Sequence, residues 1–175
     1  MRLLGICAVA VLALAGCGQA GTAMSDEEVA GELAKMPALW PGRYSTQISL
    51  VSLEAPHAAP EKLEAMRASM EKKARGGEHC LGPEKAKQGY RREIDKLTGR
   101  DRCKFHSLSV SGGRIDAKMF CSQGFFAGSA TIDLSGTVSP SSLNMTMLLK
   151  QSGGLGPTAD MTLEMKLANR MIGEC

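Results

Sequence analysis

The sequence predicts a mainly β protein of the α+β class: an antiparallel meander of about six strands, with two amphipathic helices inserted after the first strand. Apolar and polar residues alternate through most of the C-terminal half, as they do in strands with one buried face. Clusters of Gly, Ser and Pro separate these stretches, and two helix-like patterns lie within residues 57–99. Because one side of the sheet would be apolar, we expect a curved sheet or half-barrel around that side.

The expected strands follow from the alternation. The first covers residues 41–53, where one face carries Tyr44, Thr46, Ile48 and Leu50. Further strands are expected at residues 103–110, 114–121, 126–135, 142–150 and 159–168. In the first hairpin, Leu108 and Val110 fall off the face of Cys103, which predicts a β-bulge. Short connections favour a meander over a Greek key.

Three helices are expected. Ser25 and Glu28 fit a capping box, which predicts a short helix near residues 26–35. The two inserted helices cover residues 60–75 and 83–97, each beginning with a proline in the first turn. Their apolar stripes are Leu63, Met66, Met70 and Ala74 in the first, and Ala86, Tyr90, Ile94 and Leu97 in the second.

The N-terminal stretch MRLLGICAVAVLALAGC has the plan of a bacterial secretory signal. Arg2 precedes an apolar run, residues 3–15, that is too short to span a bilayer as a stable helix. The tetrapeptide LAGC resembles a lipobox, which predicts cleavage before Cys17 and a lipid on its thiol that anchors the protein to a membrane. Gly18 follows in place of Asp. By analogy with lipoprotein sorting, this favours the inner leaflet of the outer membrane, facing the periplasm.

The chain therefore divides into a signal peptide at 1–16, a lipidated tether with a short helix at 17–37, and one β-rich domain at 38–175. The helical insertion of that domain covers residues 57–99. Charged residues make up 22% and apolar residues 43%, which indicates a globular chain. A net charge of +3 is too small to indicate a nucleic acid partner. Since aromatic residues are 4% against 11 Met, the core must be mostly aliphatic and Met.

The cysteines predict two disulfides. Once the signal peptide is removed and Cys17 is lipidated, four cysteines remain, in a compartment that permits disulfides. Folding the central hairpin about Gly112, in its Gly-Gly turn, sets Cys103 opposite Cys121, close enough to bond. The remaining pair is Cys80 with Cys175, which would tie the last residue to the middle of the chain.

Four stretches in order resemble domain-of-unknown-function family 3617, a family of secreted or lipid-anchored proteins of Gram-negative bacteria. They are PALWPGRYSTQISL, HCLGPEKA, CKFHSLSVSGGRIDAKMFC and the C-terminal NRMIGEC. The resemblance covers roughly residues 38–175, and Trp40-Pro41-Gly42 permutes the family's proline-glycine-tryptophan opening. It implies the same cysteine framework and no activity.

Two other cysteine chemistries were weighed against disulfides. His79 with Cys80, and Cys103 with His106, could supply four zinc ligands, although the spacing is not that of a standard zinc motif. Nucleophilic catalysis by Cys and His would need a free thiol, which an even cysteine count argues against. The sequence has no Gly-x-Ser-x-Gly, Walker or His-Glu-x-x-His motif. We therefore expect no enzyme activity, no metal and no other cofactor.

Methionines recur at every second position of the later strands. The set that could line one face is Met119, Met145, Met147, Met161 and Met165. Methionine at this spacing is most often adaptable core. The alternatives are a cavity for a lipophilic ligand, or a soft Cu(I) site of thioethers.

Residues 61–104 are basic, with 13 Lys or Arg against eight Asp or Glu. Such a segment could meet anionic lipid or an envelope polymer, and the alternative is a solvated helix face. The sequence thus predicts a non-catalytic structural or interaction module of the cell envelope. The alternative is a binding protein for a small apolar ligand or lipid in the concave face of the sheet. No protein partner is indicated.

Overall fold

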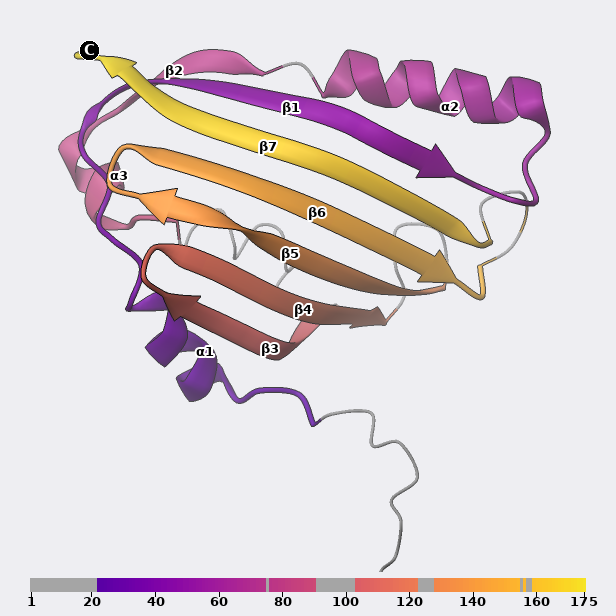
Figure 1. The fold of residues 1–175 in the computed structure, drawn as a ribbon, viewed down its shortest axis with the longest axis horizontal. Coiled ribbons are helices and arrows are strands. Elements are labelled where there is room, and N and C mark those ends of the chain that lie inside the picture. The colour runs from indigo at the N-terminus through magenta and orange to yellow at the C-terminus, as the bar shows by residue number, and fades with distance from the viewer. Residues whose placement is uncertain (1–21, 75, 91–102, 123–127, 155, 157–158) are drawn as a thin grey trace, which may run out of the picture.

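Seven antiparallel strands form one sheet in the computed structural model, in the order β2–β1–β7–β6–β5–β4–β3 (Figure 1). The structure describes residues 22–74, 76–90, 103–122, 128–154, 156 and 159–175. The strands are β1 (Gly42–Glu54), β2 (Gly77–Leu81), β3 (Cys103–Ser111), β4 (Arg114–Ser122), β5 (Ser129–Ser139), β6 (Ser142–Ser152) and β7 (Met161–Gly173). The helices are α1 (Asp26–Leu33), α2 (Pro60–Lys73) and α3 (Pro83–Lys87). The signal peptide, the lipobox and Cys17 lie outside the described residues.

The mainly β, antiparallel prediction is confirmed, and strands β3 to β7 form the expected meander. Strand β1 joins this meander beside β7, so the first and last strands of the chain are neighbours. The expected half-barrel is wrong. The edge strands β2 and β3 do not pair with each other, so the sheet is open and uncurled. Pairing between β1 and β7 widens the sheet without closing it.

Two local predictions needed correction. Strand β2 was not predicted, because its five residues show no apolar alternation and gain their place only by pairing with the start of β1. The helix expected over 83–97 ends at Lys87. Gly89 takes φ +57, a left-handed conformation that ends α-helices. Residues 91–97 of that predicted helix lie outside the described residues.

The core covers one face of the sheet, as the alternation predicted. Across the middle of this face, Leu134 on β5 pairs with Met147 on β6, which pairs with Met165 on β7 and then Leu50 on β1. Helix α1 adds the buried Leu33 to the same cluster. Burial of this apolar face supplies most of the driving force for folding.

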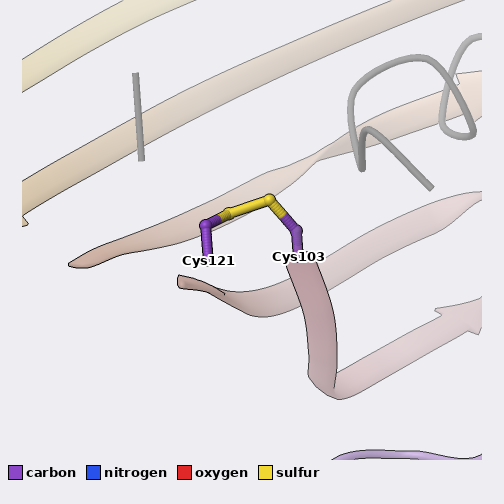
Figure 2. The surroundings of a disulfide bond; sticks show 2 residues. All are labelled: Cys103 and Cys121. Atoms are coloured by element: carbon purple, nitrogen blue, oxygen red, sulfur yellow. A yellow bond between two sulfur atoms is a disulfide. The ribbon is translucent and has the colours of Figure 1, made fainter. Parts of the chain in front are cut away.

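The β3–β4 hairpin places the first cysteine pair. Gly112-Gly113 both take positive φ, as a two-residue hairpin turn of this type requires. The predicted bulge is confirmed around His106, where the register shifts by one residue. Without that extra residue, the turn would set Cys103 opposite Ser122. With it, Cys103 lies opposite Cys121, and the two form a disulfide with a Cα–Cα distance of 3.9 Å (Figure 2).

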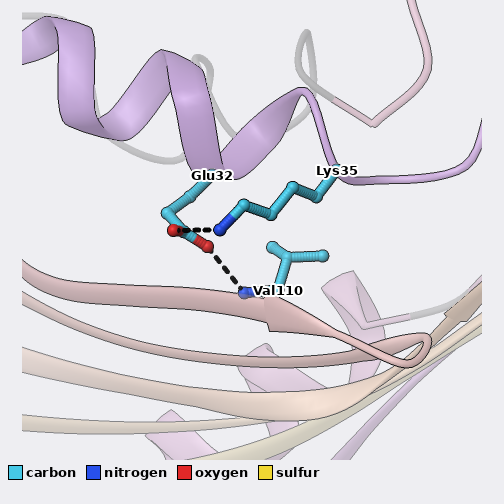
Figure 3. Close-up of polar contacts among 3 residues, drawn as sticks. All are labelled: Glu32, Lys35 and Val110. Carbon is cyan, nitrogen blue, oxygen red and sulfur yellow. Dashed lines mark hydrogen bonds and ion pairs between the residues drawn. The ribbon is translucent and has the colours of Figure 1, made fainter.

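Helix α1 covers the outer edge of β3 (Figure 1). The Glu32 carboxylate accepts a hydrogen bond of 3.0 Å from the Val110 N–H of β3 and pairs with Lys35 (Figure 3). The Met24 N–H donates to the Phe105 carbonyl, also on β3, at 2.7 Å. Backbone groups of this edge strand thus bond to α1 and its leading residues, which reduces their ability to pair with another chain.

At the opposite side of the sheet, β2 and α2 cover the side of β1 that does not pair with β7. Strand β2 pairs with residues 42–46 of β1, and helix α2 packs against β1. Arg67 of α2 donates to the Leu53 carbonyl at 3.3 Å. A Cβ at Gly76 would lie 1.6 Å from the Thr46 carbonyl oxygen, so only glycine permits this approach.

Candidate functional site

Three segments that are far apart in the sequence meet at one end of the sheet. Arg43 at the start of β1 pairs with Cys80 on β2 and, on its other side, with Gly173 on β7. The C-terminal end of the chain lies beside β2 (Figure 1). We define the clasp end as residues 40–44, 79–81 and 171–175. It contains parts of three of the four stretches that resemble the family.

Trp40 is the most exposed large apolar side chain of the described residues, at 57%. Its backbone is nonetheless held from both sides. The Trp40 N–H donates to the Pro140 carbonyl at 2.9 Å, and the Trp40 carbonyl accepts from the Tyr44 hydroxyl at 2.8 Å. The preceding Leu39 is buried. A fixed backbone therefore presents an indole to solvent.

Tyr44 forms the buried base beneath this tryptophan. The side chain is fully buried, and its hydroxyl lies 3.2 Å from the Pro140 carbonyl oxygen as well as bonding to Trp40. Burial raises the pKa of the Tyr44 hydroxyl. The ring stacks against His79 of β2, with centroids 6.0 Å apart. Tyr44 therefore connects β2, the start of β1 and the β5–β6 turn.

Gly42 allows β1 and β7 to approach closely at the clasp end. A Cβ at this position would lie 2.8 Å from the Gly173 carbonyl oxygen and 2.5 Å from Cε of Met171. The first contact is with backbone, which cannot move aside as a flexible side chain can. A larger residue at Gly42 would therefore separate the two strands.

Cys80 and Cys175, which the sequence paired by elimination, lie together at the clasp end. Both are free, exposed thiols in this structure, and they lie close enough for Cys80 to raise the pKa of Cys175. The hydrogen bond to Cys80, followed by partial desolvation and the charge of Cys80, raises the pKa of Cys175. The Leu81 N–H and the Arg43 guanidinium act in the opposite direction. The structure thus brings the predicted partners together without a covalent bond.

The four residues weighed as zinc ligands are not brought together. His79 and Cys80 lie on β2, whereas Cys103 and His106 lie on β3 at the opposite edge of the sheet. Cys103 is also consumed by its disulfide. Within the described ranges, no three His, Cys, Asp or Glu side chains are grouped as metal ligands.

The five methionines share a face and one hydrophobic cluster, but they are not all neighbours of one another. Met119 on β4 is 1% exposed and lies in the core, separated from β7 by two strands. Met161 is also buried, and its partner on β6 is Gln151. Met147 lies opposite Met165, and both are half-buried, like Met145 two positions away on β6. The methionines in the middle of the face are therefore more exposed than Met119 and Met161.

The basic segment is only partly described. Helix α2 has no buried residue, and Lys72 and Lys73 in its last turn are exposed. Its apolar stripe, Leu63, Met66 and Met70, is half-buried against the core. Residues 91–102 of the basic segment lie outside the described residues. None of the described helices has both the length and the hydropathy that crossing a bilayer requires.

Sequence reasoning treated Trp40 only as part of a family motif and Tyr44 only as a strand residue. A signal was present, because Trp40 is the single tryptophan and stands directly before Pro41-Gly42 and an alternating strand. What the sequence could not show is that Pro140, 100 positions away, holds the Trp40 backbone.

These features define an open antiparallel β-sheet protein whose first strand, edge strand and C-terminus meet at one end, next to a segment that carries an exposed tryptophan. The sequence model of the family described as "Protein of unknown function (DUF3617)" matches residues 39–175, most of the chain. The chain therefore belongs to this family, as the four stretches had indicated. No curated protein and no solved structure is significantly similar to it.

Proposed function

We propose that this protein is a lipoprotein of the bacterial cell envelope whose β domain is a non-catalytic interaction module facing the periplasm. The lipobox-like LAGC supports the anchor, through Cys17, in the inner leaflet of the outer membrane. The single observation that supports an interaction role is Trp40, an exposed indole on a backbone held by two hydrogen bonds.

A tryptophan in this setting suits recognition. Trp is enriched among the residues that dominate protein interfaces, because one side chain buries a large apolar area. A side chain on a rigid support also loses less conformational entropy on binding. The tether would hold the module near the membrane while the clasp end meets its partner.

The anchor is tested by replacing Cys17 with alanine in the full chain. Cys17→Ala should move the protein from the membrane fraction to the soluble periplasmic fraction and abolish incorporation of labelled palmitate. The matched control is Cys7→Ala, a cysteine within the expected signal peptide, which should leave both unchanged. Membrane association and labelling that survive Cys17→Ala would refute the lipoprotein proposal.

The interaction role is tested by placing a photo-crosslinking amino acid at position 40 of the chain in cells. We expect discrete crosslinked species that are absent when the same group stands at Val51, an apolar β1 residue that is 43% exposed. Equal, diffuse crosslinking at both positions would contradict a docking role for Trp40.

A second candidate function is the binding of a small apolar ligand or lipid. The observation that favours it is the half-buried Met147–Met165 pair, which lies next to the buried Leu149–Leu163 pair on the same face. Thioether side chains adapt readily to ligands of different shape. Native mass spectrometry of the protein purified from its own envelope should then show a co-purifying lipid, whereas repeated empty preparations would count against this candidate.

A further inference from the structure

We propose that Cys80 and Cys175 form a disulfide in the mature protein, and that this bond is an exchange-accessible clasp closing β2 and the C-terminus around the start of β1. The proposal rests on the periplasmic location proposed above, because an oxidant is available in that compartment. The geometry of the two cysteines can be tested separately. The proposed disulfide adds a covalent link between β2 and the chain end that follows β7, and thiol reagents can open this link.

The register places the two cysteines on either side of one residue. Cys80 is the partner of Arg43 on β2, and Gly173 is the partner of Arg43 on β7. Cys175 stands two residues beyond Gly173, after the end of β7, and the chain end lies beside β2 (Figure 1). Cys175 is also close enough to Cys80 and Leu81 for both residues to affect the pKa of its thiol. The last two residues therefore pass the start of β1 and reach β2.

Bond formation needs only an external disulfide as oxidant. The thiolate of one cysteine attacks a sulfur of a protein disulfide, which releases one thiolate and leaves a mixed disulfide. The second cysteine then displaces the oxidant. The Cys80–Cys175 bond forms with loss of two protons and two electrons, and the oxidant leaves as a dithiol. The reaction can run in reverse with an external dithiol, since both sulfurs are exposed.

The bond would act on the weakest pairing of the sheet. Strand β2 pairs with β1 over only five residues, and most of its side chains are exposed. Between β2 and β1, the ring contact of Tyr44 with His79 adds to this pairing. A covalent link from Cys80 to the chain end would hold β2 against β1 and so keep His79 stacked beneath the Trp40 support.

Peptide mapping of the full lipidated chain tests the clasp. The protein is extracted from envelopes after free thiols are blocked with a maleimide, and is digested without reductant. We expect one peptide pair linking Cys80 with Cys175, a second linking Cys103 with Cys121, and no maleimide on any of the four. Maleimide on Cys80 and Cys175, or a link from either to another cysteine, would overturn the proposal.

A graded titration with a dithiol reductant tests exchange. Cys121 is buried whereas Cys80 and Cys175 are exposed, so the clasp should open at roughly tenfold lower reductant or faster rate than the hairpin bond. Simultaneous opening of both bonds would overturn the claim of selective access. Cys175→Ser serves as the folding control, because it should keep the circular dichroism spectrum and the hairpin bond while leaving Cys80 open to maleimide.

Oxidation in vitro tests whether Cys80 and Cys175 can bond, independently of where the protein is located in the cell. The reduced, folded chain is incubated with oxidised glutathione. Formation of the Cys80–Cys175 bond there, together with free thiols in cells, would overturn the clasp in the mature protein and count against the oxidising location, while the geometry would stand. If no Cys80–Cys175 bond forms in vitro, the geometry itself is refuted.

Discussion

The two cysteine pairs lie at opposite edges of an open sheet and depend on contacts of different range. Cys103 and Cys121 belong to one hairpin, 18 residues apart, and their edge strand is sealed by α1. Cys80 and Cys175 belong to an edge strand and the chain end, and they meet only after β1 has paired with β7. The first pair follows from local turn geometry, and the second requires the whole sheet.

This difference predicts how each region responds to change. The hairpin should form early and tolerate disturbance elsewhere, since its contacts are local. The clasp end depends on long-range pairing, so any change that separates β1 from β7 should also separate Trp40, Cys80 and Cys175.

The largest effect is expected from removing the clasp bond in the oxidised protein. Replacing Cys80 and Cys175 by serine should lower Tm by roughly 10 °C, because a bond closing a loop of about 100 residues restricts the unfolded chain most. Differential scanning calorimetry measures this, and the same variant should match the wild type when both are reduced. An equal Tm in oxidising buffer would contradict the proposed bond.

The hairpin bond should contribute less. Replacing Cys103 and Cys121 by alanine should lower the free energy of unfolding by about 3 kcal/mol, as expected for a loop of this length. Urea unfolding measures the loss. If this variant loses more stability than the clasp variant, local packing of the buried Cys121 outweighs the loop-entropy argument.

The close approach of β1 and β7 can be tested with one methyl group. Gly42→Ala should cost about 2 kcal/mol, because its Cβ meets the Gly173 carbonyl and the Met171 side chain. Gly31→Ala in α1 is the matched control, since no atom lies within 4 Å of its Cβ, and it should be neutral or slightly stabilising. Chemical denaturation compares the two. Equal stabilities would show that β7 can yield at this point.

Removal of one hydroxyl probes the support of Trp40. Tyr44→Phe should cost about 1 kcal/mol, because the Trp40 carbonyl loses a hydrogen bond within a buried region. Trp40 is the single tryptophan, so its fluorescence anisotropy reports the change directly and should fall as the indole becomes more mobile. Unchanged anisotropy would show that the Pro140 contact alone holds this residue.

The smallest effect is a pH dependence at the hairpin edge. The Lys35 side chain and then the Val110 N–H hold the pKa of Glu32 below its usual value of 4.5. Because the folded pKa is lowered, this stabilising contribution is complete above the unfolded pKa and is lost as pH falls through the folded pKa. Amide exchange at Val110, corrected for intrinsic rate, should therefore accelerate as the pH falls below 4.5 and through the lowered pKa of Glu32.

Glu32→Gln provides the control for this titration. Its amide oxygen can still accept from Val110 but does not titrate, so the acceleration specific to low pH should disappear. Persistence of the acceleration in this variant would assign it to another group.

Much of the fold could be predicted because its signals are local. The alternation in β5, β6 and β7, the capping box at Ser25 and the Gly-Gly turn each depend on residues close in sequence. The Cys103–Cys121 bond was predicted from a midpoint at Gly112, and it is correct because the bulge near His106 compensates for the two-residue turn. The candidate site was less predictable. Each of its residues could be noted in the sequence, but the sequence did not show that they lie together at one end of the sheet.

The amino-acid sequence was enough to locate strands β1 and β3 to β7, the buried face of the later strands, and the two cysteines that close the hairpin. These depend on backbone periodicity and turn geometry, which act over a few residues. The folded structure decided that β1 lies beside β7, that β2 exists, and that Trp40, Tyr44, Cys80 and Cys175 share one end of an open sheet. Those features depend on backbone hydrogen bonds and side-chain contacts between residues that are far apart in the sequence, such as those of β1 and β7. No local pattern specifies which distant edge will supply them.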